Sequence, residues 1–109
     1  MKTEISYHNI QKRSHAELEG LIDELSQTHL ERHMTKFPAD ATELHVHVEK
    51  SEHHSRYRIK LRLGIPKENL ESADESDEII PALRKSFAEL ERQLEEHLTR
   101  IRQEGRGAP

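Results

Sequence analysis

Two neighbouring segments of the chain alternate strictly between apolar and polar residues, and this pattern constrains the fold more than any other. In residues 43–49 the apolar positions are Leu44, Val46 and Val48. In residues 56–63 they are Tyr57, Ile59, Leu61 and Leu63. A period of two residues predicts β-strands, each with one side in a core and the other in solvent.

The connection between these segments, residues 50–55, is short and polar, and it therefore predicts an antiparallel hairpin. The simplest register gives four facing pairs on the polar side: Glu49 with Arg56, His47 with Arg58, His45 with Lys60 and Glu43 with Arg62. Two of these pairs join opposite charges, which favours the pairing.

The residues before the hairpin predict one strand and one helix. Residues 4–8 alternate and predict a short strand. Ser14 and Glu17 have the spacing of a capping box, which places the start of a helix at Ser14. One face of that helix carries Leu18, Leu21, Ile22 and Leu25. We expect the helix to continue towards Lys36 and residues 37–40 to close it, because a residue that precedes proline disfavours helical geometry.

The residues after the hairpin predict a turn, a weak strand and a long helix. The turn is expected at 64–69 and the fourth strand at 70–73, and Ser76 or Asp77 caps the second helix. The apolar stripe of this helix consists of Leu83, Phe87, Leu90, Leu94, Leu98 and Ile101. The order β-α-β-β-β-α predicts an α+β fold in which two helices pack on one face of a four-stranded sheet.

Length and composition limit the class of protein. The 109 residues predict a single domain, which we place at 1–104, followed by a flexible C-terminal tail, 105–109. The chain has no cysteine and no apolar run near the roughly 20 residues of a membrane span, so we expect a cytoplasmic protein without membrane contact. It also has no Gly-rich phosphate loop and no recognisable catalytic arrangement. We therefore expect no enzymatic activity, no cofactor and no small-molecule substrate.

The formal net charge of −4 means that any phosphate-binding surface must be a local patch of cations. On the second helix, Lys85 and Arg92 lie almost opposite the apolar stripe. Arg100 lies nearer one flank, and Arg84 and Arg102 share the other. These side chains are candidates for contacts with RNA phosphates. The alternative is an ordinary solvent-facing surface, in which they pair with nearby glutamates one helical turn away.

The polar side of the hairpin is a second candidate patch. Its four cations, Arg56, Arg58, Lys60 and Arg62, point the same way and span a length over which they could follow a nucleic-acid backbone. The alternative is that they pair with Glu43 and Glu49 across the hairpin.

Nine histidines raise the question of a metal site. His45 and His47 share one strand face, but His53 and His54 lie in the turn, too far from His45 to hold one ion with it. We therefore expect solvent-facing histidines and no metal. A different hypothesis is that several histidines add positive charge in a mildly acidic cytoplasm.

Several short segments, taken in order, resemble the ribosome hibernation promoting factor and ribosome-associated inhibitor family. The resemblance covers roughly residues 3–102. It rests on Ile5-Ser6-Tyr7-His8-Asn9-Ile10, Val48-Glu49-Lys50, the acidic run Asp74-Glu75-Ser76-Asp77-Glu78 before Ala82-Leu83, and Arg92-Gln93-Leu94 followed by His97. The chain resembles the short form of the family. It departs from the family pattern where Glu89, Glu96 and Leu98 replace expected lysines.

The resemblance implies a factor that occupies the decoding channel of the small ribosomal subunit and keeps idle ribosomes silent. It also implies that basic residues of the two helices, the second above all, face ribosomal RNA. Arg32 and Lys36, at the exit of the first helix, would assist. We expect the free protein to be a monomer. An alternative of another class is a protein-binding regulatory module that keeps the fold but has lost ribosome binding.

Overall fold

A computed structural model describes residues 1–107, and it confirms the predicted α+β fold and the order of its strands and helices. The strands are β1 (Lys2–His8), β2 (Glu43–Lys50), β3 (Tyr57–Ile65) and β4 (Glu68–Ser76). The helices are α1 (His15–His29) and α2 (Ile79–Gly107), with short 3-10 turns η1 (Lys12–Ser14), η2 (Glu31–His33) and η3 (Ala39–Ala41). Of the predicted tail, 105–107 belong to α2, and 108–109 lie outside the described residues.

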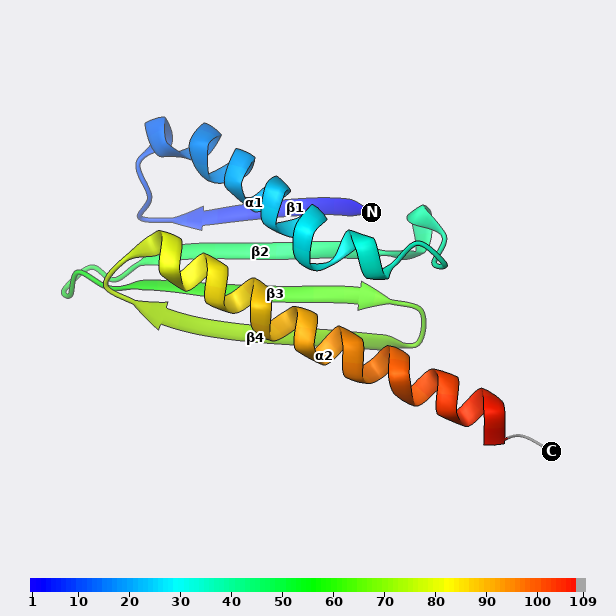
Figure 1. Ribbon diagram of the computed structural model, residues 1–109. Coiled ribbons are helices and arrows are strands. Elements are labelled where there is room, and N and C mark those ends of the chain that lie inside the picture. The colour runs from blue at the N-terminus through cyan, green and yellow to red at the C-terminus, as the bar shows by residue number, and fades with distance from the viewer. Residues whose placement is uncertain (108–109) are drawn as a thin grey trace.

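The four strands form one sheet in the order β1-β2-β3-β4. β1 and β2 run parallel, whereas the other neighbours are antiparallel. A parallel pair needs a connection that crosses back over the sheet, and α1 lies in that connection. Both helices lie over the same face of the sheet, so its other face stays open (Figure 1).

The core lies between the two helices and the inner face of the sheet. The apolar positions of both alternating segments are buried in it as predicted, except Tyr57, which is only partly buried, and Phe87 of α2 is completely buried there. The C-terminal end of α2 runs past the sheet (Figure 1), and Leu98 is only partly buried. Ile101, the last member of the predicted stripe, is 44% exposed.

The predicted register of the hairpin is wrong by two residues. The structure pairs Glu49 with Arg58, His47 with Lys60, His45 with Arg62 and Glu43 with Gly64. The connection contains six residues, 51–56, and the backbone N–H of Ser51 donates to the Arg56 carbonyl at 2.9 Å. A shift by two residues leaves every side chain on its predicted face, because side chains alternate along a strand.

The first helix begins where the sequence predicts, directly after Ser14, but the predicted capping hydrogen bond and the predicted C-terminal end are wrong. Ser14 ends η1 with a helical backbone and makes no capping hydrogen bond, whereas a capping residue normally has an extended backbone. At the other end α1 stops at His29, well before Lys36. A separate turn, η2, follows it.

The fourth strand is longer than predicted, and the turn before it is shorter. β4 covers Glu68–Ser76, which reduces the predicted turn 64–69 to Pro66 and Lys67. Several inward-facing positions of β4 are polar, and this hides the strand in the sequence. Ser72, for example, is buried but donates a hydrogen bond to the Ser86 carbonyl at 2.9 Å. The cap predicted at Ser76 or Asp77 lies too early in the chain, because α2 begins at Ile79 and Ser76 Oγ accepts from the N–H of Glu78, which precedes the helix, at 3.2 Å.

The turn between β3 and β4 offers a test of backbone strain. Lys67 has φ of +68°, a conformation that favours glycine or asparagine after a proline in this kind of turn. We expect Lys67→Asn to raise the free energy of unfolding by about 0.5–1 kcal/mol, because asparagine tolerates this conformation better. Urea denaturation measures the change. Lys67→Ala removes the same charge but keeps the strain, so it is expected to bring no such gain.

Candidate nucleic-acid interface

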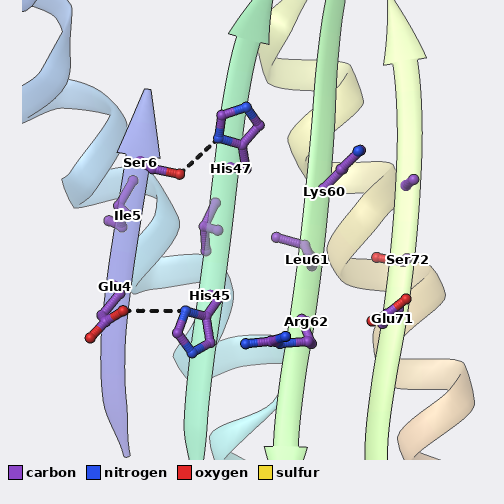
Figure 2. A pocket seen from close by; sticks show the side chains of 12 residues that line it. Glu4, Ile5, Ser6, His45, His47, Lys60, Leu61, Arg62, Glu71 and Ser72 are labelled. Atoms are coloured by element: carbon purple, nitrogen blue, oxygen red, sulfur yellow. Dashed lines mark hydrogen bonds and ion pairs between the residues drawn. The ribbon is translucent and has the colours of Figure 1, made fainter. Parts of the chain in front are cut away.

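The open face of the sheet carries polar side chains in rows that cross all four strands. One row consists of Ser6, His47, Lys60 and Ala73, and the next consists of Glu4, His45, Arg62 and Glu71. These two rows line a shallow hollow of about 680 Å³ (Figure 2). The hollow lies on the face that no helix covers, so a large partner can reach it.

The two histidines of the hollow have different neighbours. His47 Nδ1 and Ser6 Oγ share a hydrogen bond of 2.7 Å. His45 lies between two carboxylates, with Glu4 and Glu43 each at 3.3 Å from a ring nitrogen. The row of His45 therefore contains acids beside its cation, whereas Lys60 is the one formally charged side chain in the row of His47.

The four predicted cations of the hairpin separate into two pairs. Arg56 and Arg58 both approach the carboxylate of Glu75, at 3.9 and 3.7 Å. Lys60 and Arg62 are exposed, and neither has a carboxylate within 4.0 Å among the residues that the structure describes. The predicted pairing with Glu43 and Glu49 therefore does not neutralise the middle of this face.

Two of the five predicted cations of α2 are held by acids. Arg92 binds Glu89 at 2.6 Å and also bonds to Glu96, one turn away on the other side. The hydrogen bonds that Arg92 donates to Glu89 lower the pKa of Glu89 and raise the pKa of Arg92. Lys85 lies 3.4 Å from Asp74 of β4. The alternative of ion pairs one helical turn away is therefore confirmed for Arg92, whereas Lys85 pairs with an aspartate of the neighbouring strand instead.

The other three cations of α2, Arg84, Arg100 and Arg102, are exposed. The positions one turn from Arg84 hold Ile80, Pro81, Phe87 and Ala88. No acid is therefore placed to neutralise Arg84 within the helix. Arg84 lies near the start of α2, whereas Arg100 and Arg102 belong to its C-terminal third.

The two predicted cations near the end of α1 also differ. Lys36 is exposed. Arg32 donates to Glu91 Oε2 of α2 at 2.6 Å, and Glu91 also accepts hydrogen bonds from His29 and His33. Burial alone would raise the pKa of Glu91, but the hydrogen bonds from Arg32, His33 and His29 outweigh it and lower the pKa from its usual 4.5 to about 2.

A comparison with protein families supplies the identification. The family described as sigma 54 modulation protein / S30EA ribosomal protein matches residues 3–102. The chain belongs to this family. The family resemblance of the short sequence segments is thereby confirmed. Within residues 1–107, no helix of this S30EA family member is long and apolar enough to cross a bilayer.

Solved structures share the fold of this S30EA family member at low sequence identity. A ribosomal subunit interface protein from Coxiella burnetii has a TM-score of 0.72 and 14% identity, over 91% of this chain and 99% of that one. The N-terminal domain of Protein Y from Thermus thermophilus has a TM-score of 0.62 and 12% identity, over 89% and 99%. The comparison with curated proteins finds no match.

Sequence reasoning missed two features of this S30EA family member. It placed His45 and His47 on the open face but not the Glu4 and Ser6 side chains beside them, because the pairing of β1 with β2 joins residues 41 positions apart. It also missed Glu91 as the centre of a hydrogen-bond cluster. The spacing of His29 and His33, four residues apart, was the available signal for that cluster.

Proposed function

We propose that the protein binds the ribosome, occupies the decoding channel of the small subunit and holds translation back by that occupancy alone. Membership of the S30EA family supports ribosome binding. The observation on which the RNA contact rests is the pair of exposed cations, Lys60 and Arg62, that face no carboxylate within 4.0 Å among the described residues. They lie beside two histidines on a face that a large anionic partner can reach.

The distribution of cations suits a channel better than a flat surface. Lys60 and Arg62 lie on the open sheet face, whereas Arg84 and Arg92 lie on the helix that covers the opposite face. A protein lodged in a channel has RNA on several sides, so both groups can contact phosphates at the same time. Exposed arginine and lysine side chains are the usual partners of the phosphate backbone.

The ion-paired cations remain available to RNA in this proposal. Arg92, Lys85 and Arg58 are all about half exposed or more. An exposed ion pair stabilises a protein by only about 0–1 kcal/mol, so an RNA phosphate can replace the carboxylate at little cost. Lys36, Arg56, Arg100 and Arg102 would add weaker contacts around the same surfaces.

Sedimentation with purified ribosomal subunits tests the proposal. We expect the protein to co-sediment with the small subunit and not with the large one at low salt. Contacts with several phosphates should weaken binding roughly 1,000-fold between about 50 and 200 mM salt. Binding to neither subunit at low salt would contradict the proposal.

A protein-binding module is the second candidate function. The exposed side chains of Ile80 and Ile101 on α2 favour it, because both are large and apolar. A protein interface built on such residues responds weakly to salt, since apolar contacts are not screened by ions. Absence of subunit binding at low salt, together with binding to a protein partner that changes little up to about 200 mM salt, would therefore favour this second function.

A further inference from the structure

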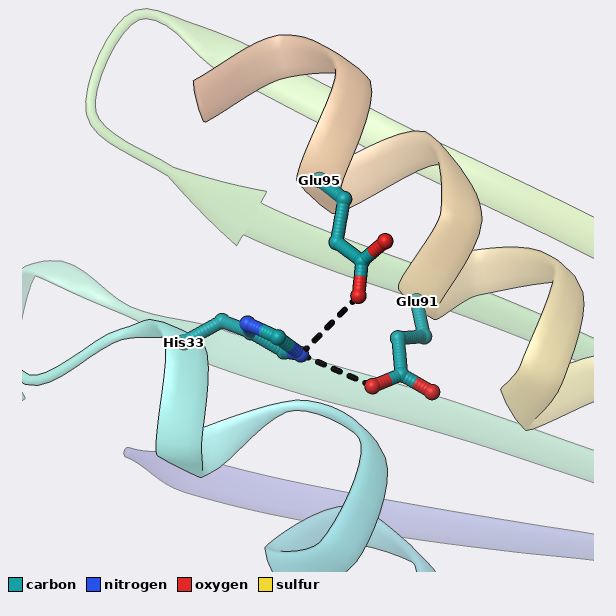
Figure 3. Close-up of side chains that lie close together, drawn as sticks. All are labelled: His33, Glu91 and Glu95. Carbon is teal, nitrogen blue, oxygen red and sulfur yellow. Dashed lines mark hydrogen bonds and ion pairs between the residues drawn. The ribbon is translucent and has the colours of Figure 1, made fainter. Parts of the chain in front are cut away.

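His33, Glu91 and Glu95 converge between η2 and α2, away from the open face of the sheet (Figure 3). His33 Nε2 lies 2.7 Å from Glu91 Oε2 and 3.4 Å from Glu95 Oε1. One nitrogen or oxygen atom from each of the three residues lies within 4.8 Å of those of the other two. The imidazole ring points into the space between the two carboxylates.

The backbone places these groups by simple helical spacing. Glu91 and Glu95 are four residues apart, so they project from the same side of α2. That side faces the end of α1 and η2, where His29 and His33 lie. Three of the four side chains, His29, His33 and Glu91, are more than three-quarters shielded from solvent. The cluster is therefore a partly enclosed set of nitrogen and oxygen donors.

We propose that this cluster binds a divalent transition-metal ion of the zinc class. The protein ligands are His33 Nε2, Glu91 Oε2 and Glu95 Oε1, and water takes the fourth position. Metal–ligand bonds of about 2.0–2.1 Å in a tetrahedral site place neighbouring ligand atoms about 3.3 Å apart. The separation between His33 and Glu95, 3.4 Å, already has this value. The shorter distance to Glu91, 2.7 Å, opens by about 0.6 Å when the ion replaces the hydrogen bond.

The charges of the cluster favour a divalent cation. Two carboxylates meet one guanidinium there, that of Arg32, at 2.6 Å from Glu91. A divalent ion neutralises both carboxylates, and the side chain of Arg32, which is 62% exposed, can then turn into solvent. Glu91 keeps its orientation because His29 Nδ1 bonds to its other oxygen at 2.8 Å. Such a second contact is the usual support for a carboxylate that binds metal.

The donor set also selects the type of metal. Calcium and magnesium prefer oxygen ligands alone, whereas an imidazole nitrogen suits zinc, nickel and cobalt. One histidine with two carboxylates therefore favours the transition metals over the hard cations. Magnesium serves as the negative control in the binding experiment.

Titration of the free protein with Co²⁺, followed by visible absorption, tests this site, and calorimetry with Zn²⁺ gives the stoichiometry. We expect one equivalent to bind, with absorption bands that indicate tetrahedral nitrogen and oxygen ligands. His33→Gln and Glu95→Gln should each weaken binding at least tenfold. Glu95 is exposed, so its replacement leaves the fold intact.

His45→Gln is the matched control. His45 also lies beside two glutamates, Glu4 and Glu43, but on the sheet face. This variant should bind the metal as the unchanged protein does. The site is refuted if no saturable binding occurs, or if His45→Gln weakens binding as much as His33→Gln. No ribosome is present in these measurements, so their outcome is independent of the proposed function.

Discussion

Replacing Lys60 and Arg62 by glutamate is expected to lower the affinity for the small ribosomal subunit by at least about 100-fold. Two charge-assisted contacts of about 1.5 kcal/mol each correspond to this factor. Repulsion between the new carboxylates and RNA phosphates adds to it. The substitutions lie on the open face, where both side chains are exposed, so the fold is expected to persist. Co-sedimentation at fixed low salt, with the fold checked by circular dichroism, measures the effect.

Two further double variants test which surface of the protein contacts ribosomal RNA. Lys85→Glu with Arg92→Glu should weaken binding by only about tenfold, because these cations already have carboxylate partners that compete with phosphate. Lys12→Glu with Lys67→Glu makes the same change in net charge at exposed positions outside the proposed contacts. This control should bind almost as well as the unchanged protein. A stronger loss for the α2 variant than for the sheet variant would make α2 the main interface.

Glu91→Gln is expected to reduce the free energy of unfolding by about 2 kcal/mol at neutral pH. The Glu91 carboxylate, 14% exposed, is the common partner of His29, Arg32 and His33. A fall in its pKa from 4.5 to about 2 corresponds to at most about 3 kcal/mol, at 1.36 kcal/mol per unit. Glutamine keeps the shape of the side chain but not its charge. Urea denaturation of both proteins measures the loss.

The loss of stability should depend on pH in a defined direction. Folding lowers the pKa of Glu91, so its ionised form stabilises the fold fully above pH 4.5. That contribution disappears as the pH falls from 4.5 through about 2. The difference between Glu91→Gln and the unchanged protein should therefore be smaller at about pH 3.5 than at about pH 7.

Glu95→Gln is the control for this stability measurement. Its carboxylate is 55% exposed and makes one contact in the cluster, with His33 at 3.4 Å. Its replacement should change the stability by less than about 0.5 kcal/mol. Equal losses for Glu91→Gln and Glu95→Gln, or a loss for Glu91→Gln that does not vary with pH, would contradict the role given to Glu91.

The fold was predictable wherever burial imposes a regular pattern. Leu44, Val46 and Val48 alternate with polar residues because one side of β2 packs against the helices. The side of the strand on which each residue lies was therefore predicted correctly, although the register was wrong. The register depends on the length of the connecting loop, which alternation does not encode. β4 was underestimated because Ser72 and other polar residues occupy part of its inner face. The Ser86 carbonyl that accepts from Ser72 is 14 residues away in the sequence.

The sequence predicted which side of the hairpin carries the cations of the candidate interface. It did not predict which of these cations pair with acidic residues. Strand alternation placed Lys60 and Arg62 together on the polar side, and the sheet agrees. Which cations have acidic partners depends on contacts between distant segments. The pair of Arg32 with Glu91 spans 59 residues, and no local spacing indicates it.

The parallel pairing of β1 with β2 determines how the sheet can open. β2, β3 and β4 are sequential neighbours, whereas β1 is an edge strand that joins them only after a loop of more than 30 residues closes. Local unfolding should therefore release β1 first, and its amide hydrogens should exchange fastest among the strands. Ser6 and Glu4 leave the hollow with it. A partner that spans β1 and β3 would hold the edge strand in place and slow its exchange, so binding would itself complete the sheet.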